Sequence, residues 1–300
     1  MPAAGYFGGV LPGGWRFIPV VYAGLLVLMA AAVWLLAPRR DRCPGRGKSL
    51  ADMAAPARQA RVWEFSLHYV VVFGAYVALS AVLPKYYLDN FGPELAGKLG
   101  LGGELVADFA GINALKGEAY AAYMAANPVV KADLSYLIQW AGVLAAVCFV
   151  FPASLLRPLG GHLSDRLGAA PVMAGVFAAM LASGLLLSVP AAGLGVVGFT
   201  AALFVLGAGM GVGKASVYKM IPDRFPHAVG AVGGLVGLLG AVGGVLLPLA
   251  WRPLQARFGV PQVVFGALLG LTVLSAGWFA VGLSAGRVRR PAAVLEPVGA

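Results

Sequence analysis

The charged residues that could do chemistry stand at the edges of long apolar runs. Arg157 stands at the end of one such run, and Asp165 and Arg166 follow the paired glycines Gly160 and Gly161. A charge inside hydrocarbon is costly unless it faces water or a partner, so such residues often mark a substrate path. An arginine can donate two parallel hydrogen bonds to two oxygens of a small oxyanion. Arg157 is therefore a candidate anion ligand. The alternative is an arginine whose tip reaches the membrane interface.

Lys214 is a second charge in an apolar run, and no acidic residue of its own run can pair with it. Its ammonium group could add positive field to a cavity, or the amine could exchange a proton. Alternatively, it reaches lipid phosphates together with Lys219. Tyr218 follows Lys214 by one helical turn, so its hydroxyl is a candidate hydrogen-bond partner for Lys214 whether that side chain faces a cavity or lipid.

Glycine recurs on nearly every helical turn between residues 230 and 244. The positions are Gly230, Gly233, Gly234, Gly237, Gly240, Gly243 and Gly244. Such a helix exposes its backbone along one face and permits close helix packing. The same face could let a flat anion slide past Gly233, Gly237 and Gly240 while the helix rocks. The two interpretations are compatible.

The elements that carry these residues are predicted to span a membrane. The 300 residues are 60% hydrophobic and only 11% charged, with a mean hydropathy of +0.85, which excludes a water-soluble globule. An apolar helix of about 20 residues crosses the hydrocarbon of a bilayer. We therefore expect an all-α integral membrane protein, a polytopic bundle of about seven spans at 17–37, 65–84, 134–156, 171–189, 194–213 with a polar extension, 228–251 and 260–285.

The distribution of Lys and Arg predicts the orientation, because short basic loops stay in the cytoplasm. The 38–64 linker is expected inside, since it holds Arg39, Arg40, Arg42, Arg46, Lys48, Arg58 and Arg61. The 287–300 tail, with Arg287, Arg289 and Arg290, is expected inside as well. The 85–133 segment is slightly acidic and should form an outside helical cap around residues 116–126. The net charge of +10 then reflects topology and anionic membrane lipids, and nucleic acid is a poor explanation for it.

Two stretches carry a family resemblance. GGHLSDRLG, from Gly160 to Gly168, resembles the G-x-L-x-D-R-x-G loop of the major facilitator superfamily. GKASVYKMIP, which begins at Gly213, and the glycine stretch after it resemble the C-terminal half of nitrate/nitrite porters of the NarK type. HYVVVFGAY, which begins at His68, is similar to the first helix of that half.

The resemblance implies a major facilitator C-terminal half with the helix that precedes it. Residues 1–37 would be the last helix of a missing N-terminal bundle, and 65–286 the six-helix C-terminal bundle. The implied function is nitrate/nitrite transport by alternating access, as exchange or with protons, in the bacterial inner membrane. Partners would be the anion, membrane lipids, and a complementary N-terminal half or a second copy. The implied gating motif comprises Gly161, Asp165, Arg166 and Gly168, and the implied substrate-binding set comprises Arg157, Lys214, Tyr218, Gly233, Gly237 and Gly240.

Within that motif, Asp165 is expected either to cap the helix that follows or to pair with a basic group that separates when the gate opens. In the resembling family, an arginine at the position of Arg157 binds the anion opposite an arginine of the other half.

No motif supports an enzyme, and we expect no cofactor or metal. His68, His162 and His227 lie at different predicted depths and offer no pair of haem ligands on facing spans. The sequence has no phosphate loop, Cys-x-x-Cys or His-Glu-x-x-His, and the acidic residues are assigned to loops. Two alternatives to a nitrate/nitrite porter remain open: another anion porter of the superfamily, and a non-transporting membrane scaffold or fragment.

Overall fold

The computed structural model describes residues 17–36, 49, 51, 54–189 and 191–284, and this part of the chain holds helices and no strand. Seven of its helical stretches are long and apolar enough to cross a membrane. They are 19–36, 60–98, 128–167, 169–187, 193–224, 229–258 and 263–283. The prediction of an all-α polytopic bundle with seven spans is therefore confirmed.

From η2 onward, the described elements follow one another with short connections. They are α2 (Phe17–Leu36), η2 (Ala55–Arg58), α4 (Ala60–Tyr69), η3 (Val70–Gly74), α5 (Ala75–Lys98), α6 (Gly103–Ala107), α7 (Phe109–Ala114), α8 (Gly117–Ala126), α9 (Pro128–Ala145), η4 (Ala146–Val150), α10 (Phe151–Leu155), α11 (Arg157–Leu167), α12 (Ala169–Leu187), α13 (Ala191–Arg224), α14 (Val229–Phe258) and α15 (Val263–Ser284). The elements η3 and η4 are π-helical turns that join their neighbours into longer helices.

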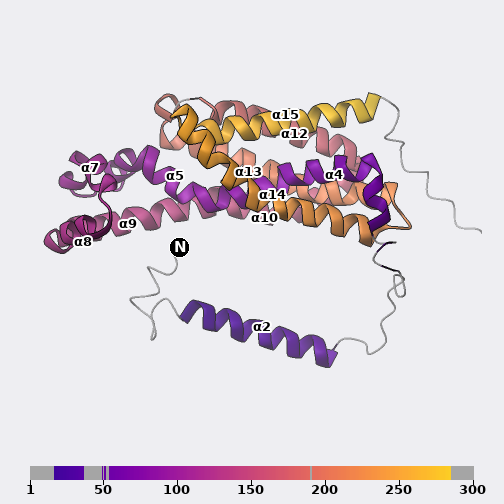
Figure 1. The fold of residues 1–300 in the computed structure, drawn as a ribbon, viewed down its shortest axis with the longest axis horizontal. Helices are drawn as coiled ribbons and strands as arrows, with labels where there is room; N and C mark the ends of the chain where they lie inside the picture. The colour runs from indigo at the N-terminus through magenta and orange to yellow at the C-terminus, as the bar shows by residue number, and fades with distance from the viewer. Residues whose placement is uncertain (1–16, 37–48, 50, 52–53, 190, 285–300) are drawn as a thin grey trace, which may run out of the picture.

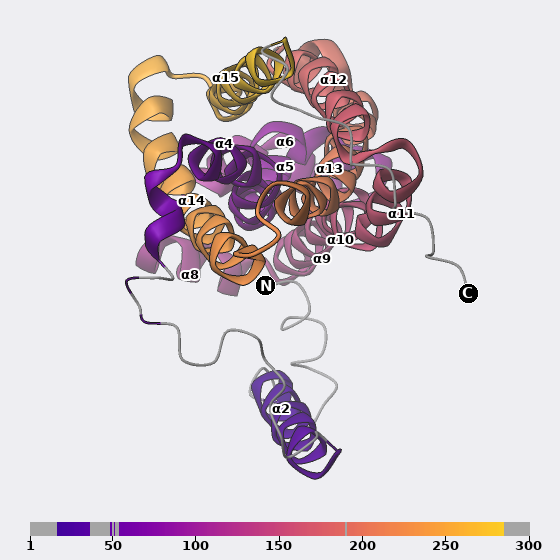
Figure 2. The same cartoon turned by 90° about the vertical axis from the view of Figure 1, so that its right-hand side faces the viewer.

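The bundle helices run side by side along the long axis of the molecule, and α2 lies apart from them (Figures 1 and 2). The described side chains of α2 are almost all exposed, as expected for a helix whose contacts are lipid or another chain. Inside the bundle, aromatic rings from three helices form one cluster. Its members are Tyr86, Tyr87 and Phe91 of α5, Phe199 of α13 and Phe265 of α15, with ring centroids 4.9 to 6.4 Å apart.

Several predicted span ends are too early. Helix α5 continues past Pro84 to Lys98, although Pro84 and Pro93 lie inside it. Proline is tolerated in membrane helices where neighbouring helices satisfy the freed backbone groups. Helix α14 likewise runs to Phe258, whereas the continuation of α13 to Arg224 matches the polar extension that was expected after residue 213. The segment 85–133 therefore comprises the end of α5, the cap and the start of α9 rather than loop throughout.

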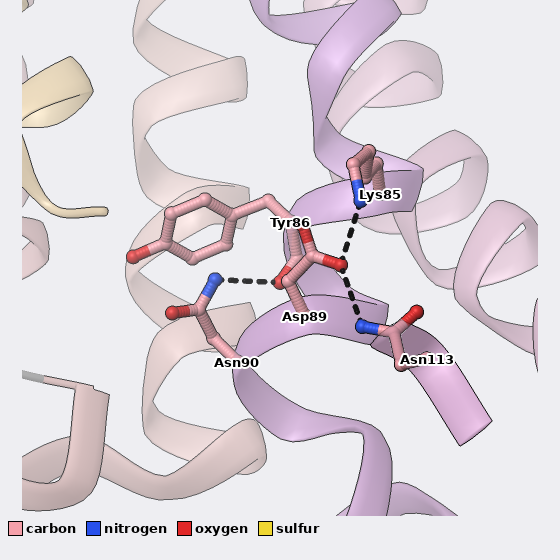
Figure 3. Close-up of polar contacts among 5 residues, drawn as sticks. All are labelled: Lys85, Tyr86, Asp89, Asn90 and Asn113. Carbon is pink, nitrogen blue, oxygen red and sulfur yellow. Dashed lines mark hydrogen bonds and ion pairs between the residues drawn. The ribbon is translucent and has the colours of Figure 1, made fainter. Parts of the chain in front are cut away.

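The cap consists of α6, α7 and α8 at one end of the bundle (Figure 1). Helix α8 coincides with the region where helix formers predicted a helical cap. The carboxylate of Asp89 on α5 accepts hydrogen bonds from Lys85 Nζ at 2.8 Å and from Asn113 Nδ2 of α7 at 3.3 Å (Figure 3). The backbone N–H of Gly102 donates to Asp133 at 3.0 Å. The Asn113 contact joins α7 of the cap to α5, and the Gly102 contact joins the segment just before α6 to α9.

The basic residues predicted for the cytoplasmic linker from Arg39 to Lys48, and those of the 287–300 tail, lie outside the described residues.

Candidate functional site

Arg157 lies at a break between two helices. Helix α10 ends at Leu155, Leu156 has φ −81° and ψ 1°, and α11 begins with Arg157. Pro158 follows and has no N–H, so the helical hydrogen bond to the carbonyl four residues earlier is lost and a break is favoured here. The Arg157 side chain is exposed in this chain. The break thus presents a guanidinium group at the surface of the bundle.

The guanidinium of Arg157 lies over an aromatic ring. Its Cζ atom is 5.6 Å from the centroid of the Tyr218 ring, a cation–π distance. The Tyr218 ring meets the Tyr69 ring edge-on at 5.0 Å, and Tyr69 stacks on Phe73 at 5.0 Å. Arg157 also lies within electrostatic reach of Tyr69. Three helical segments, α4 with η3, α11 and α13, therefore bring one arginine and three aromatic rings together.

The glycine positions of α14 accommodate these rings. The Tyr218 hydroxyl donates to the carbonyl of Gly233 at 3.2 Å, and a Cβ atom at Gly237 would lie 2.9 Å from that hydroxyl. A Cβ atom at Gly240 would overlap the Tyr69 ring. The structure thus places Gly233 and Gly237 against Tyr218 and Gly240 against Tyr69, the two rings next to Arg157, and a Cβ atom at Gly237 or Gly240 would crowd those rings.

Lys214 lies behind this surface and is only 3% exposed. Its Nζ atom donates to the carbonyl of Ala153 on α10 at 3.0 Å and lies 3.2 Å from the centroid of the Tyr76 ring. The Tyr218 hydroxyl uses a different partner, Gly233. The interpretation of Lys214 as a lipid-facing lysine is therefore wrong, because its ammonium group points into the bundle. Its charge lies within electrostatic reach of Arg157.

The motif that resembles a loop is helical in the structure. Residues 157–167 form α11, and Gly168 with φ +91° ends it and precedes α12. Such a φ is accessible to glycine with little cost. Gly160 is the glycine that permits close approach, since a Cβ there would lie 2.5 Å from the Val212 carbonyl oxygen, whereas Gly161 has open space.

Asp165 pairs across helices. Its carboxylate lies 2.5 Å from Nζ of Lys219 on α13, and it caps no helix, since α12 has no side-chain cap. Asp165, Arg166 and Gly168 line a cleft of about 590 Å³ at the end of the bundle, together with Lys219. Below we call this volume the end cleft. Of the two roles expected for Asp165, the geometry matches the ion pair.

Sequence reasoning missed the aromatic part of the site. Tyr69, Phe73 and Tyr76 follow one another at intervals of four and three, the spacing of one helical face, so this signal was present. Among the described residues, no three His, Cys, Asp or Glu side chains come together that could hold a metal ion.

Comparisons with known proteins agree on one group of relatives, although no family model matches. The chain is 45% identical over 294 residues to a probable nitrate/nitrite antiporter, NarK1, of Thermus thermophilus, across 93% of this chain and 56% of that protein. It is 26% identical over 263 residues to the nitrite extrusion protein of Bacillus subtilis, across 87% and 54%. It is 23% identical over 255 residues to a probable nitrate transporter, NarT, of Staphylococcus epidermidis, across 84% and 53%. The chain spans about half the length of these relatives.

Proposed function

We propose that this chain, a homologue of NarK-type nitrate/nitrite transporters, is the C-terminal half of such a transporter in the bacterial inner membrane. Arg157 is the anion ligand, and the chain works by alternating access against a complementary N-terminal half or a second copy. The names of the relatives support nitrate and nitrite as substrates. The observation that carries the proposal is the exposed Arg157 guanidinium on the aromatic surface beside the glycine face of α14.

The physical basis is the combination of the forked guanidinium of Arg157 with the aromatic ring of Tyr218 beneath it. The guanidinium plane can donate two parallel hydrogen bonds to two oxygens of one anion. The Tyr218 ring supports that plane, so less side-chain entropy is lost when an anion binds. Lys214 is buried within electrostatic reach of Arg157, and when its amine is protonated it adds positive field without itself being exposed to the anion. An oxyanion that presents two oxygens to this surface can therefore accept both hydrogen bonds of the guanidinium.

The end cleft supports the second part of the proposal. The Asp165–Lys219 pair joins α11 to α13 where both side chains are about half exposed, at 58% and 44%. A pair of this kind contributes little to stability, so it can separate when the cleft changes shape. Gly161, Asp165, Arg166 and Gly168 then act as a gate at this end of the bundle.

The test is anion exchange in proteoliposomes. The chain is reconstituted together with an N-terminal half from the Thermus thermophilus relative, and nitrite-loaded vesicles are supplied with labelled nitrate. We expect exchange that sulfate and phosphate do not inhibit. Inhibition by those anions equal to that by nitrite would indicate another anion porter. No anion flux from a correctly assembled pair would indicate a non-transporting scaffold.

A further inference from the structure

A buried acid and a buried histidine lie one helical turn apart on α4. Glu64 is 5% exposed and His68 is fully buried. The Nε2 atom of His68 is 3.9 Å from Oε1 of Glu64, which is within ion-pair range and beyond hydrogen-bond distance. Arg61 lies 3.7 Å from the same carboxylate. This pair is separate from the Arg157 surface, and the sequence-based assignment of acidic residues to loops is wrong for Glu64.

Helix α15 builds the other wall of this site. The Nδ1 atom of His68 shares a hydrogen bond of 2.7 Å with the hydroxyl of Ser275. A Cβ atom at Gly282 would lie 2.8 Å from the Glu64 carboxylate, so glycine leaves room for it there. The rings of Phe177 and Phe279 meet the imidazole edge-on at 5.4 and 5.7 Å. The imidazole is therefore held in place on all sides but one.

The remaining side of the His68 imidazole carries the Nε2 atom. It has no hydrogen-bond partner among the described residues although it is fully buried, and a buried polar atom without a partner is destabilising. With Nδ1 fixed on Ser275, a proton added at Nε2 creates a donor that faces the Glu64 carboxylate. A small rotation of either side chain closes the remaining gap. The nearby negative charge then stabilises the imidazolium that burial alone would disfavour.

The end cleft gives this pair a route to water. Glu64 and Arg61 line it, as do charged residues from two other helices: Asp165 and Arg166 of α11, and Lys219, Asp223 and Arg224 of α13. The other neighbours of the imidazole, from α12 and α15, are Phe177, Phe279 and Ser275, none of which titrates near neutral pH. A proton can therefore enter through the cleft, reach the Glu64 carboxylate and pass to Nε2 one turn deeper.

We propose that Glu64 and His68 form a proton-binding site, in which Nε2 of His68 takes one proton from the end cleft and donates it in a hydrogen bond to Glu64. With the proton bound, the hydrogen bond at Nε2 joins His68 to Glu64 within α4, while the hydrogen bond at Nδ1 joins α4 to Ser275 of α15. The role of this site in transport rests on the proposed function: proton binding at the end cleft would accompany anion transport.

Histidine-selective nitrogen labelling tests the site without any transport assay. The chain has three histidines, so the ring-nitrogen NMR signals of the full chain in detergent are few, and the signal lost in His68→Gln identifies the residue. We expect the His68 ring to gain a proton between about pH 9 and pH 5. In Glu64→Gln, which keeps the shape but removes the charge, the midpoint should fall by about one pH unit or more. Glu118→Gln, an exposed acid of α8, should leave the midpoint unchanged.

Two results would overturn the site: a His68 ring that stays neutral over this whole range, or a midpoint that is the same in wild type and Glu64→Gln. If His68→Gln does not fold, Ser275→Ala serves for the assignment, because it perturbs the Nδ1 signal of the same ring. The anion-exchange assay reports on the proposed function separately. Titration of His68 in a chain that moves no nitrate would retain the proton site and refute only the transport role.

Discussion

The Nζ atom of Lys214 lies 3.2 Å from the centroid of the Tyr76 ring, inside the bundle and one layer below the Arg157 surface. The same ammonium group donates to the carbonyl of Ala153, four residues before Arg157. Because α10 ends two residues after Ala153, its last carbonyls need partners outside the helix. Lys214 therefore stabilises the helix break that presents Arg157.

Lys214→Ala should destabilise the chain by about 2 to 4 kcal/mol, because it leaves a cavity and an unpaired buried carbonyl at Ala153. Thermal unfolding in detergent measures the effect. Lys98→Ala is the matched control, since Lys98 is half exposed and forms only a 3.9 Å surface pair, so its cost should stay below about 1 kcal/mol. Equal losses in the two variants would mean that the Lys214 contacts contribute nothing specific.

The glycines of α14 should differ sharply in their tolerance of a methyl group. Gly240→Ala places a Cβ atom against the Tyr69 ring and should cost about 1 to 3 kcal/mol. Gly234→Ala has open space and should be neutral or stabilising by up to about 1 kcal/mol, because alanine favours a helix. Melting temperatures of the two single variants provide the comparison. A Gly234→Ala protein as unstable as Gly240→Ala would show that the face packs against something other than the aromatic rings.

The Asp165–Lys219 pair should contribute little to stability, because both side chains are well exposed. A double-mutant cycle with Asp165→Asn and Lys219→Met measures the coupling free energy in thermal unfolding. We expect a coupling of about 1 kcal/mol or less. A coupling of several kcal/mol would argue against a pair that opens during transport.

The cap and the end cleft should face opposite sides of the membrane. In a background with Cys43→Ser and Cys148→Ser, Glu118→Cys on α8 should react with an impermeant thiol reagent in intact cells. Arg166→Cys in the end cleft should react only after the cells are opened. The reversed pattern of labelling would refute the orientation that the Lys and Arg distribution predicts.

The sequence alone was enough to predict the seven spans, because long apolar runs are a direct signal of membrane helices. Their ends were harder to place. Helix α5 continues through Pro84 because tertiary packing outweighs the local cost of proline, and packing is not visible in a single sequence. The GGHLSDRLG stretch was interpreted as a loop because it resembles a loop motif, yet within this stretch only Gly168 has the positive φ that ends a helix.

The candidate site was predicted in part. Arg157, Tyr218 and the α14 glycines stood out by residue type and spacing, and the structure brings them together. The hydrogen bond from Lys214 to Ala153 could not be foreseen, because a backbone carbonyl carries no sequence signal. The Glu64–His68 pair was missed because Arg61 and Glu64 lower the local hydropathy, so the second span was predicted to begin only at Phe65.

The substitution Arg157→Lys tests the central claim most directly. Lysine keeps the positive charge but cannot donate two parallel hydrogen bonds. If those two bonds orient the anion, lysine should not replace Arg157 in binding. In proteoliposomes that hold the chain and a complementary N-terminal half, we expect nitrate affinity to fall by about 5-fold to 150-fold, the equivalent of roughly 1 to 3 kcal/mol.

Arg257→Lys, at an exposed position of α14, serves as the control and should transport like wild type. The measurement is the concentration dependence of nitrate uptake at equal protein level. Loss of affinity in Arg157→Lys alone is the predicted result. Unchanged uptake in Arg157→Lys would contradict the account, because lysine reaches a membrane interface as well as arginine does and only anion binding distinguishes them.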